Sequence, residues 1–369
     1  MQENNILIAS PAVFAVGKEY QISVLVSCEA LMWVKVGDEC YYDASNGILR
    51  SRSRLHKMSV PMDKLDAEKK YVVCYRKIIE RKPYFTEAED VVEIPFDFIP
   101  VSGENIRAYH IADAHNRIEE PVVAVHMYEK NFGKIDFLIL NGDIPDHSAS
   151  IENFNTIYQI VSKVTKGNIP TVFSRGNHDT RGIYAENIED YTPCQNGNSY
   201  YSFRLGSIWG LVLDCGEDKD DSSAEYGYTI CCHDFRKTET KYIEKIIKDS
   251  DEEYNENGIN HKIVIVHNPF TKILNPPFDI EQEIYTYWAK LLKDYVKPDI
   301  MICGHVHRLE IYEQGGEHDN LGQPCTVVVG SMPKENYFAG CGYEFGDNGI
   351  IVTFTDSEGA VISRKNILI

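Results

Sequence analysis

Seven side chains between Asp113 and His307 have the types and the spacing of ligands for divalent metal ions. They lie in short motifs, and each motif follows an apolar run that is typical of a β-strand: D-A-H after RAYHIA, G-D after IDFLILN, G-N-H-D after IPTVFSR, one histidine after KIVIV, and G-H-V-H after DIMIC. The candidate ligands are Asp113, His115, Asp143, Asn177, His267, His305 and His307. Because open α/β sheets hold their ligands at the C-terminal ends of their strands, we expect these side chains to converge.

The chemistry of the set indicates two metal ions. Imidazole, carboxylate and one amide oxygen suit manganese, iron or zinc, and the set contains no cysteine. A shared carboxylate can hold two cations about 3.5–4 Å apart, so one aspartate is predicted to bridge them. Each motif alone is usually a turn with a solvated side chain, whereas five motifs in this order are better explained by one site.

The order D-x-H, G-D, G-N-H-D, H and G-H-x-H resembles the calcineurin-like metallophosphoesterase superfamily, and the likeness covers roughly residues 105 to 369. Carried over residue by residue, the resemblance implies two metal ions with these ligands: Asp113, His115 and His307 for one, Asn177, His267 and His305 for the other, and Asp143 as the bridge. It also implies an imidazole that faces the substrate without binding metal. His178 has that position.

The implied reaction is hydrolysis of a phosphoric ester by a hydroxide that bridges the metals and attacks phosphorus in line. His178 is predicted to protonate the leaving oxygen. Asp146 is either the carboxylate that orients His178 or a turn carboxylate after Pro145. Arg181 is either a ligand for a phosphate oxygen or a surface arginine at a helix start. His147, beside the loop of the bridging aspartate, and His233, in a polar insertion, could each reach the substrate.

Composition limits the partners and the compartment. The 37 Lys and Arg against 56 Asp and Glu give a net charge of −19, so the chain has no basic footprint for a nucleic-acid polymer. The ten cysteines have neither disulfide nor zinc spacing and are predicted to be reduced thiols. No basic and apolar leader and no apolar stretch of about 20 residues is present. We therefore expect a cytoplasmic protein that acts on a small or medium phosphoester and has no membrane partner.

The first hundred residues have a different pattern, with seven apolar or alternating runs separated by short turns. The runs are 5–16, 19–27, 31–37, 40–45, 56–62, 70–78 and 91–99. This pattern predicts a β-sandwich. The segment from Leu65 to Tyr71 resembles the fibronectin type III signature that leads into a tyrosine corner, although the usual Pro and Thr between them are absent.

A sandwich of this kind ahead of a metallophosphoesterase core also resembles the purple acid phosphatases. The metal-bound tyrosine of their G-D-x-x-Y motif is absent, because Asp146 occupies that position. His115 stands where those enzymes have a small residue. The resemblance therefore implies a colourless site closer to the D-x-H branch, which includes cyclic-nucleotide phosphodiesterases and broad phosphatases.

Two domains are predicted, an immunoglobulin/fibronectin-like sandwich over 1–99 and a catalytic domain over 104–369, because Pro, Ser and Gly interrupt the strand pattern between them. In the second domain strands alternate with helices, which predicts an αββα four-layer α/β fold of two mixed sheets. The sandwich carries no candidate ligand, so it is predicted to be dispensable for metal binding, provided that its interface with the catalytic domain is not needed for folding. The acidic runs 216–225 and 249–258 are predicted to be solvated loops, and the first could overhang the site.

Three functions fit these observations to different degrees. A phosphomonoesterase is favoured slightly over a phosphodiesterase for cyclic nucleotides or other small diesters. A non-catalytic interaction scaffold, with the sandwich as the binding arm, would have lost ligands, yet none of the seven positions is missing. Action on extracellular phosphoesters, with a sandwich that binds glycans or cell-surface partners, would need an export signal.

Overall fold

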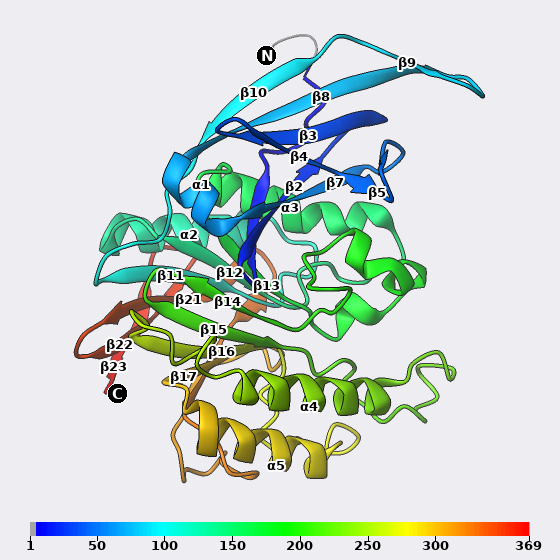
Figure 1. Cartoon of the computed structure of the whole chain (residues 1–369). Helices are drawn as coiled ribbons and strands as arrows, with labels where there is room; N and C mark the ends of the chain where they lie inside the picture. Colours follow the sequence, from blue (N-terminus) through cyan, green and yellow to red (C-terminus); the bar gives the residue numbers. More distant parts are fainter. Residues whose placement is uncertain (1–4, 369) are drawn as a thin grey trace.

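The computed structural model describes residues 5–368 and stacks two large β-sheets between pairs of helices, with a further sheet above them (Figure 1). The larger sheet has ten strands in the order β23-β22-β21-β11-β12-β13-β1-β2-β7, with β20 paired to β21. Their bounds are β1 Ala12–Val16, β2 Glu19–Leu25, β7 Leu55–Pro61, β11 Ile106–Ile111, β12 Phe137–Asn141, β13 Thr171–Ser174, β20 Met332–Lys334, β21 Tyr337–Gly346, β22 Gly349–Asp356 and β23 Val361–Ile367.

The second sheet has six strands in the order β14-β15-β16-β17-β19-β18. Their bounds are β14 Tyr201–Leu205, β15 Ile208–Leu213, β16 His261–Val266, β17 Ile300–Cys303, β18 Leu309–Tyr312 and β19 Thr326–Gly330. Alternate residues of β16 belong to different core clusters: Ile263 and Ile265 pack with the larger sheet, and Val264 and Val266 pack with the outer helices. A strand buried on both faces accounts for the unbroken apolar run in the sequence.

Helices cover the outer face of each sheet. Helices α2 (Glu119–Phe132) and α3 (Ile151–Thr165) pack on the larger sheet, and α4 (Cys232–Lys248) and α5 (Gln282–Leu291) lie on the smaller one (Figure 1). Ser150 caps the start of α3 by accepting a hydrogen bond from the amide of Glu152 (3.2 Å). The shorter helical segments are η1 His178–Thr180, η2 Ile183–Asp190 and η3 Leu292–Val296. The predicted αββα layers are therefore confirmed. None of the helices in residues 5–368 has the length and apolarity of a membrane span.

The N-terminal region contains the predicted β-structure, and all seven predicted runs form strands. Besides β1, β2 and β7, it has a sheet in the order β10-β8-β3-β4, with β9 paired to β8, and a small β5-β6 ladder. The bounds are β3 Ala30–Val36, β4 Glu39–Tyr42, β5 Ala44–Ser45, β6 Ile48–Leu49, α1 Met62–Glu68, β8 Lys70–Arg81, β9 Thr86–Ala88 and β10 Val92–Asp97. The all-β character predicted for this region is confirmed, and the short helix α1 was not expected.

One sheet runs through both halves of the chain. Strand β1 pairs in parallel with β13, with Phe14 opposite Thr171, so β1, β2 and β7 extend the sheet that carries the candidate ligands. The stretch 98–105, at the predicted boundary, contains no helix or strand. The division into domains at 1–99 and 104–369 therefore stays a prediction, and the sandwich and the catalytic core share a hydrogen-bonded sheet.

Tyr71 does not close a tyrosine corner within the sandwich. Its hydroxyl donates to the carbonyl of Gly167 (2.8 Å), which follows α3, and its ring stacks on Phe96. The amide of Ile99 likewise donates to Asn168 (2.7 Å). The predicted corner is wrong because the tyrosine finds its acceptor across the junction, where it joins the sandwich to the core.

Candidate metal centre

The candidate ligands lie in turns that follow five strands. Three of these strands, β11, β12 and β13, are neighbours in the larger sheet, and β16 and β17 are neighbours in the smaller one. Five of the seven ligands have a left-handed backbone: Asp113 (φ 55°), His115 (45°), Asp143 (54°), His305 (69°) and His307 (53°). Such conformations are costly for residues other than glycine and collect at functional sites.

Glycines allow the turns to approach one another. A Cβ atom on Gly142 would lie 2.5 Å from Nδ1 of His267 and 2.7 Å from the Cα of Gly176. A Cβ atom on Gly304 would lie 2.5 Å from the Cβ of Ala112 and 2.9 Å from Oδ2 of Asp113. The G-D and G-H-V-H motifs therefore need glycine for close packing around the ligands.

The first predicted group is brought together as expected. Nε2 of His307 lies 3.3 Å from Oδ1 of Asp113 and 3.2 Å from Nε2 of His115. The buried carboxylate of Asp113 also accepts hydrogen bonds from the amide of His305 (3.1 and 3.2 Å). Asp113, His115 and His307 thus direct ligand atoms to one point.

The second predicted group faces the first. Nε2 of His267 lies 3.1 Å from Oδ2 of Asp143 and 3.7 Å from Oδ1 of Asp113, and Nδ1 of His305 lies 3.0 Å from Oδ1 of Asn177. The carbonyl of Asn141 can only accept, so its contact with Nδ1 of His267 (2.7 Å) places the proton on Nδ1. Nε2 of His267 is buried, and the polar groups that face it are the carboxylates of Asp143 and Asp113. An imidazole nitrogen in this state beside two carboxylates fits a metal ion.

Electrostatics favour ionised carboxylates in this buried site. Burial acts to raise the pKa of the Asp143 carboxyl, but the facing His267 holds it well below its usual range. Burial acts to lower the pKa of His267, but Asp143 raises it to about 10. The pKa of Asp113 is also lowered, because His307 and His267 outweigh burial. Without a metal ion, the ionised carboxylates are therefore paired with a protonated His267, and a divalent cation would take the place of that proton.

His178 lies at the edge of this cluster. Its amide donates to Oδ1 of Asp143 (2.8 Å), and its ring contacts the ring of His115 at 4.7 Å between centroids. Nδ1 of His178 lies 2.8 Å from the backbone carbonyl of Asp146. The carboxylate of Asp146 is 3.8 Å from that nitrogen but 3.2 Å from Nδ1 of His115. The backbone of Asp146, rather than its side chain, therefore orients His178.

The two residues predicted to bind substrate have protein partners in this structure. Nη1 of Arg181 lies 3.3 Å from Nε2 of His178, and its Nη2 lies 3.0 Å from Glu217. His147 accepts a hydrogen bond from the amide of Ala149 (3.2 Å) and contacts Asn153 on α3. His233 pairs with Glu281 (2.9 Å). Of these, Arg181 is the one in contact with a predicted catalytic side chain.

Several buried polar residues support the ligands and were not assigned a role from the sequence. Oδ2 of Asp179 accepts from the amides of Gly176 (2.6 Å) and Asp143 (3.1 Å), which joins two motif turns. The side chain of Asn141 donates to the carbonyls of Val266 (3.4 Å) and Ile302 (3.1 Å), which joins the two sheets. Asn141 ends the buried strand β12 directly before the G-D motif, and Asp179 is the last residue of the G-N-H-D motif, so these positions were the available signal.

Comparisons with known proteins agree with this geometry. The family model for "Calcineurin-like phosphoesterase" matches residues 106–309. The "Serine/threonine-protein phosphatase CPPED1" of Rattus norvegicus is 26% identical over 216 residues, which are 56% of this chain and 63% of that protein. Its Homo sapiens counterpart is 24% identical over 265 residues, which are 66% of this chain and 78% of that protein. The match to the rat protein thus spans less than two thirds of its length.

A solved structure is similar over nearly the whole chain. The purple acid phosphatase PPD1 from yellow lupin (Lupinus luteus) seeds aligns with a TM-score of 0.59 and 13% sequence identity. The alignment covers 98% of this chain and 75% of the lupin chain. At this identity the likeness shows the fold alone, with the all-β region ahead of the α/β core.

Proposed function

This chain belongs to the calcineurin-like phosphoesterase family, and from that premise we propose that it hydrolyses phosphoric monoesters with two divalent metal ions as cofactors. The observation that carries the proposal is the convergence of three overlapping His and Asp groups: Asp113 with His115 and His307, Asp143 with His267 and His305, and Asp143 with His115 and His178. The CPPED1 proteins are named as serine/threonine-protein phosphatases, which favours a monoester over a diester. A phosphorylated serine or threonine in a polypeptide is therefore the first substrate class to test.

The residues would divide between the cations as the resemblance implies. One ion would have Asp113, His115 and His307 as ligands, the other would have Asn177, His267 and His305, and Asp143 would be shared. Nitrogen and oxygen ligands of this kind suit manganese, iron or zinc. When bound, the ions would lower the proton affinity of water and neutralise charge on the phosphoryl oxygens.

His178 is the proton donor in this proposal. The carbonyl of Asp146 can only accept, so the proton on Nδ1 of His178 is engaged there. Nε2 accepts from Nη1 of Arg181 in this structure (3.3 Å), and it is the atom that would have to be protonated to deliver a proton to the leaving oxygen. Arg181 lies beside that atom and is paired with Glu217, so it would bias the position of the imidazole more directly than it would bind phosphate.

The alternatives predict different results. A phosphodiesterase would use the same ligands, and a non-catalytic scaffold would have no need of them.

A cytoplasmic location is part of the proposal, and the ten free cysteines in residues 5–368, six of which are buried, support a reducing compartment.

Metal analysis of the purified protein, followed by a hydrolysis screen with Mn²⁺, Fe²⁺ and Zn²⁺, tests the proposal. The screen should include phosphoserine and phosphothreonine peptides, nucleotides, sugar phosphates, cyclic nucleotides and linear diesters. We expect two metals per chain and the highest kcat/KM on a monoester. A higher kcat/KM on diesters would favour the phosphodiesterase, and full metal content without turnover would favour the scaffold.

A further inference from the structure

The acidic run 216–225 is not wholly a solvated loop, because its first two carboxylates are buried. The exposed fractions of Glu217 and Asp218 are 1% and 8%. Arg236 of α4 anchors the start of the run, since its guanidinium donates to the carbonyls of Cys215 (2.8 Å) and Glu217 (2.5 Å). The start of the loop is thus fixed against the core and lies next to the candidate metal centre.

The two oxygens of Asp218 have different partners. Oδ1 accepts from three donors: the hydroxyl of Tyr226 (2.9 Å), Nζ of Lys219 (3.0 Å) and Nη2 of Arg181 (3.4 Å). Oδ2 faces the side-chain Nδ2 of Asn177 at 3.4 Å. Because three donors hold one oxygen, the orientation of the carboxylate is set and the other oxygen is presented to Asn177.

This contact determines which atom of the amide faces the metal position. With Nδ2 of Asn177 directed to Asp218, its Oδ1 is directed to Nδ1 of His305, 3.0 Å away. A rotated amide would set its oxygen against the carboxylate, where two acceptors repel. Amide oxygen, not amide nitrogen, is the atom that binds divalent metals.

We infer that Asp218 is a positioning residue that holds Asn177 with its oxygen towards the second metal ion. The inference rests on the proposed metal centre and goes beyond it, because neither the motifs nor the family match assigns a role to this loop. If Asp218 only held its loop in place, substituting it would have the same effect with or without the Asn177 side chain. As a positioning residue, it should affect metal binding only when Asn177 is present.

The experiment is a double-mutant cycle on the full chain. The metal-free wild type, Asp218→Asn, Asn177→Ala and the double variant are titrated with Mn²⁺ by calorimetry, and their thermal unfolding is recorded. Asp218→Asn is isosteric, and Asp220→Asn is the matched control because it removes a charge from an exposed carboxylate in the same loop. We expect Asp218→Asn to weaken the second Mn²⁺ equivalent by about tenfold to a hundredfold and to leave the first unchanged.

In the Asn177→Ala background the same change should have no further effect. Hydrolysis by Asp218→Asn should also recover at high Mn²⁺ concentration, as expected for weakened binding in an intact fold. Additive losses in the cycle, an unchanged second equivalent, or an equal loss with Asp220→Asn would overturn the inference. A wild type that binds two Mn²⁺ ions but hydrolyses no ester would instead refute the proposed function and leave the binding result intact.

Discussion

The side chain of His178 is held by the backbone of Asp146, with 2.8 Å between imidazole Nδ1 and the carbonyl oxygen. The carboxylate of Asp146, which is half-exposed, lies nearer to Nδ1 of His115 at 3.2 Å. Substitution of the side chain therefore leaves the contact to His178 in place and removes the contact to His115. The two histidines have different predicted roles, so the consequences can be separated.

We expect Asp146→Ala to weaken metal binding by about tenfold, because an outer carboxylate orients a ligating histidine. Hydrolysis at saturating metal should be little changed, and alkyl and aryl esters should lose the same factor. Chelator competition and kcat on the two esters are the measurements. A selective loss on the alkyl ester would show that the carboxylate acts through His178, as the sequence interpretation allowed.

Asp143→Asn should abolish the binding of both metal ions. The charge of Asp143 stands between the two histidine groups, and the facing His267 keeps the pKa of its carboxyl low, so the wild-type side chain is ionised. The amide removes the charge with almost no change in shape. Elemental analysis should fall from two ions per chain to less than one. A variant that retains one tightly bound ion would show that Asp143 belongs to a single site.

The sandwich should be required for folding, so the condition on which it was predicted to be dispensable for metal binding should not be met. Removal of residues 1–99 would expose the edge of β13 and the acceptor of Tyr71. Tyr71→Phe keeps the ring stacked on Phe96 but leaves the Gly167 carbonyl without its donor, so we expect a loss of about 1–3 kcal/mol in the free energy of unfolding by urea.

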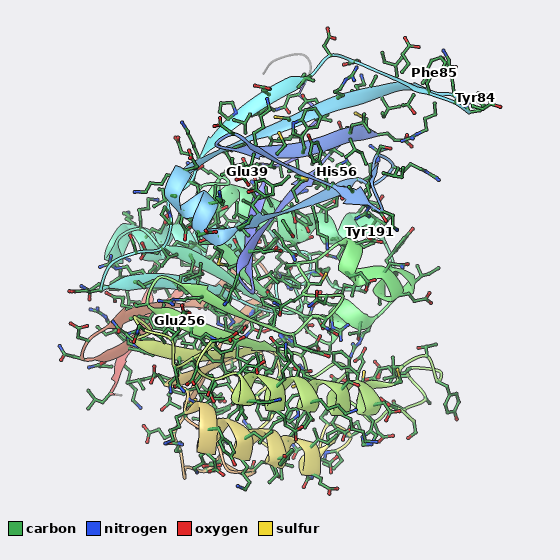
Figure 2. The ribbon with its side chains drawn as sticks, viewed as in Figure 1. Glu39, His56, Tyr84, Phe85, Tyr191 and Glu256 are labelled. Atoms are coloured by element: carbon green, nitrogen blue, oxygen red, sulfur yellow. The ribbon has the colours of Figure 1, made fainter. Side chains whose placement is uncertain are left out.

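Tyr84→Phe is the matched control for Tyr71→Phe. Tyr84 lies at the tip of the β8-β9 hairpin, far from the core, and 98% of it is exposed (Figure 2). Its hydroxyl should contribute nothing measurable. A truncated chain beginning at Val101 that stays soluble, folds and binds metal would restore the prediction that the sandwich is dispensable.

The features that could be predicted from the sequence depend on residues that are neighbours along the chain. Each candidate ligand lies one or a few positions beyond an apolar run, so the turn, the strand and the ligand type appear together in one short segment. The αββα layers followed from the alternation of strands and helices.

What the sequence did not predict depends on segments that meet only in space. Residue 14 pairs with residue 171 in a parallel ladder, and Tyr71 finds its acceptor at Gly167. The side chain of Asp218 reaches Asn177 from a loop whose composition is typical of solvated segments. The contacts of Asp146 also depend on side-chain direction, since its spacing from His178 is compatible with a contact from either the carboxylate or the carbonyl.

Glu239 on α4 should make stability fall as the pH rises. Burial raises the pKa of its carboxyl well above the usual value, and Asp214 raises it further. The unfolded chain loses this proton above about pH 4.3. The folded chain keeps this proton. The free energy of unfolding therefore decreases above that pH by up to about 1.4 kcal/mol per pH unit, until the pKa of the folded state is reached.

Glu239→Gln removes this titration and keeps the oxygen that accepts from the amide of Asp214 (2.8 Å). The advantage of the variant over the wild type in the free energy of urea unfolding should grow from pH 5 to pH 8. Glu256→Gln, in an exposed loop (Figure 2), should show no such trend. A constant difference across that range would mean that Glu239 titrates alike in both states.

His178→Asn should leave the metal content unchanged and slow hydrolysis, because only the transition state loses an interaction. The loss should depend on the leaving group. An alkyl phosphate leaves as a strongly basic alkoxide and needs a proton, so we expect its kcat to fall on the order of 10²–10⁴-fold. A nitrophenolate hardly needs the proton and should lose far less.

The structure gives a second comparison for His178. Arg181 contacts its Nε2 (3.3 Å), so Arg181→Met should displace the imidazole without removing it and give a smaller loss with the same preference for the aryl ester. The ratio of alkyl to aryl kcat at saturating metal is the measurement. Equal losses on both esters in His178→Asn would assign this histidine to phosphate or metal binding, and the proton would then have to come from His147, His233 or a metal-bound water.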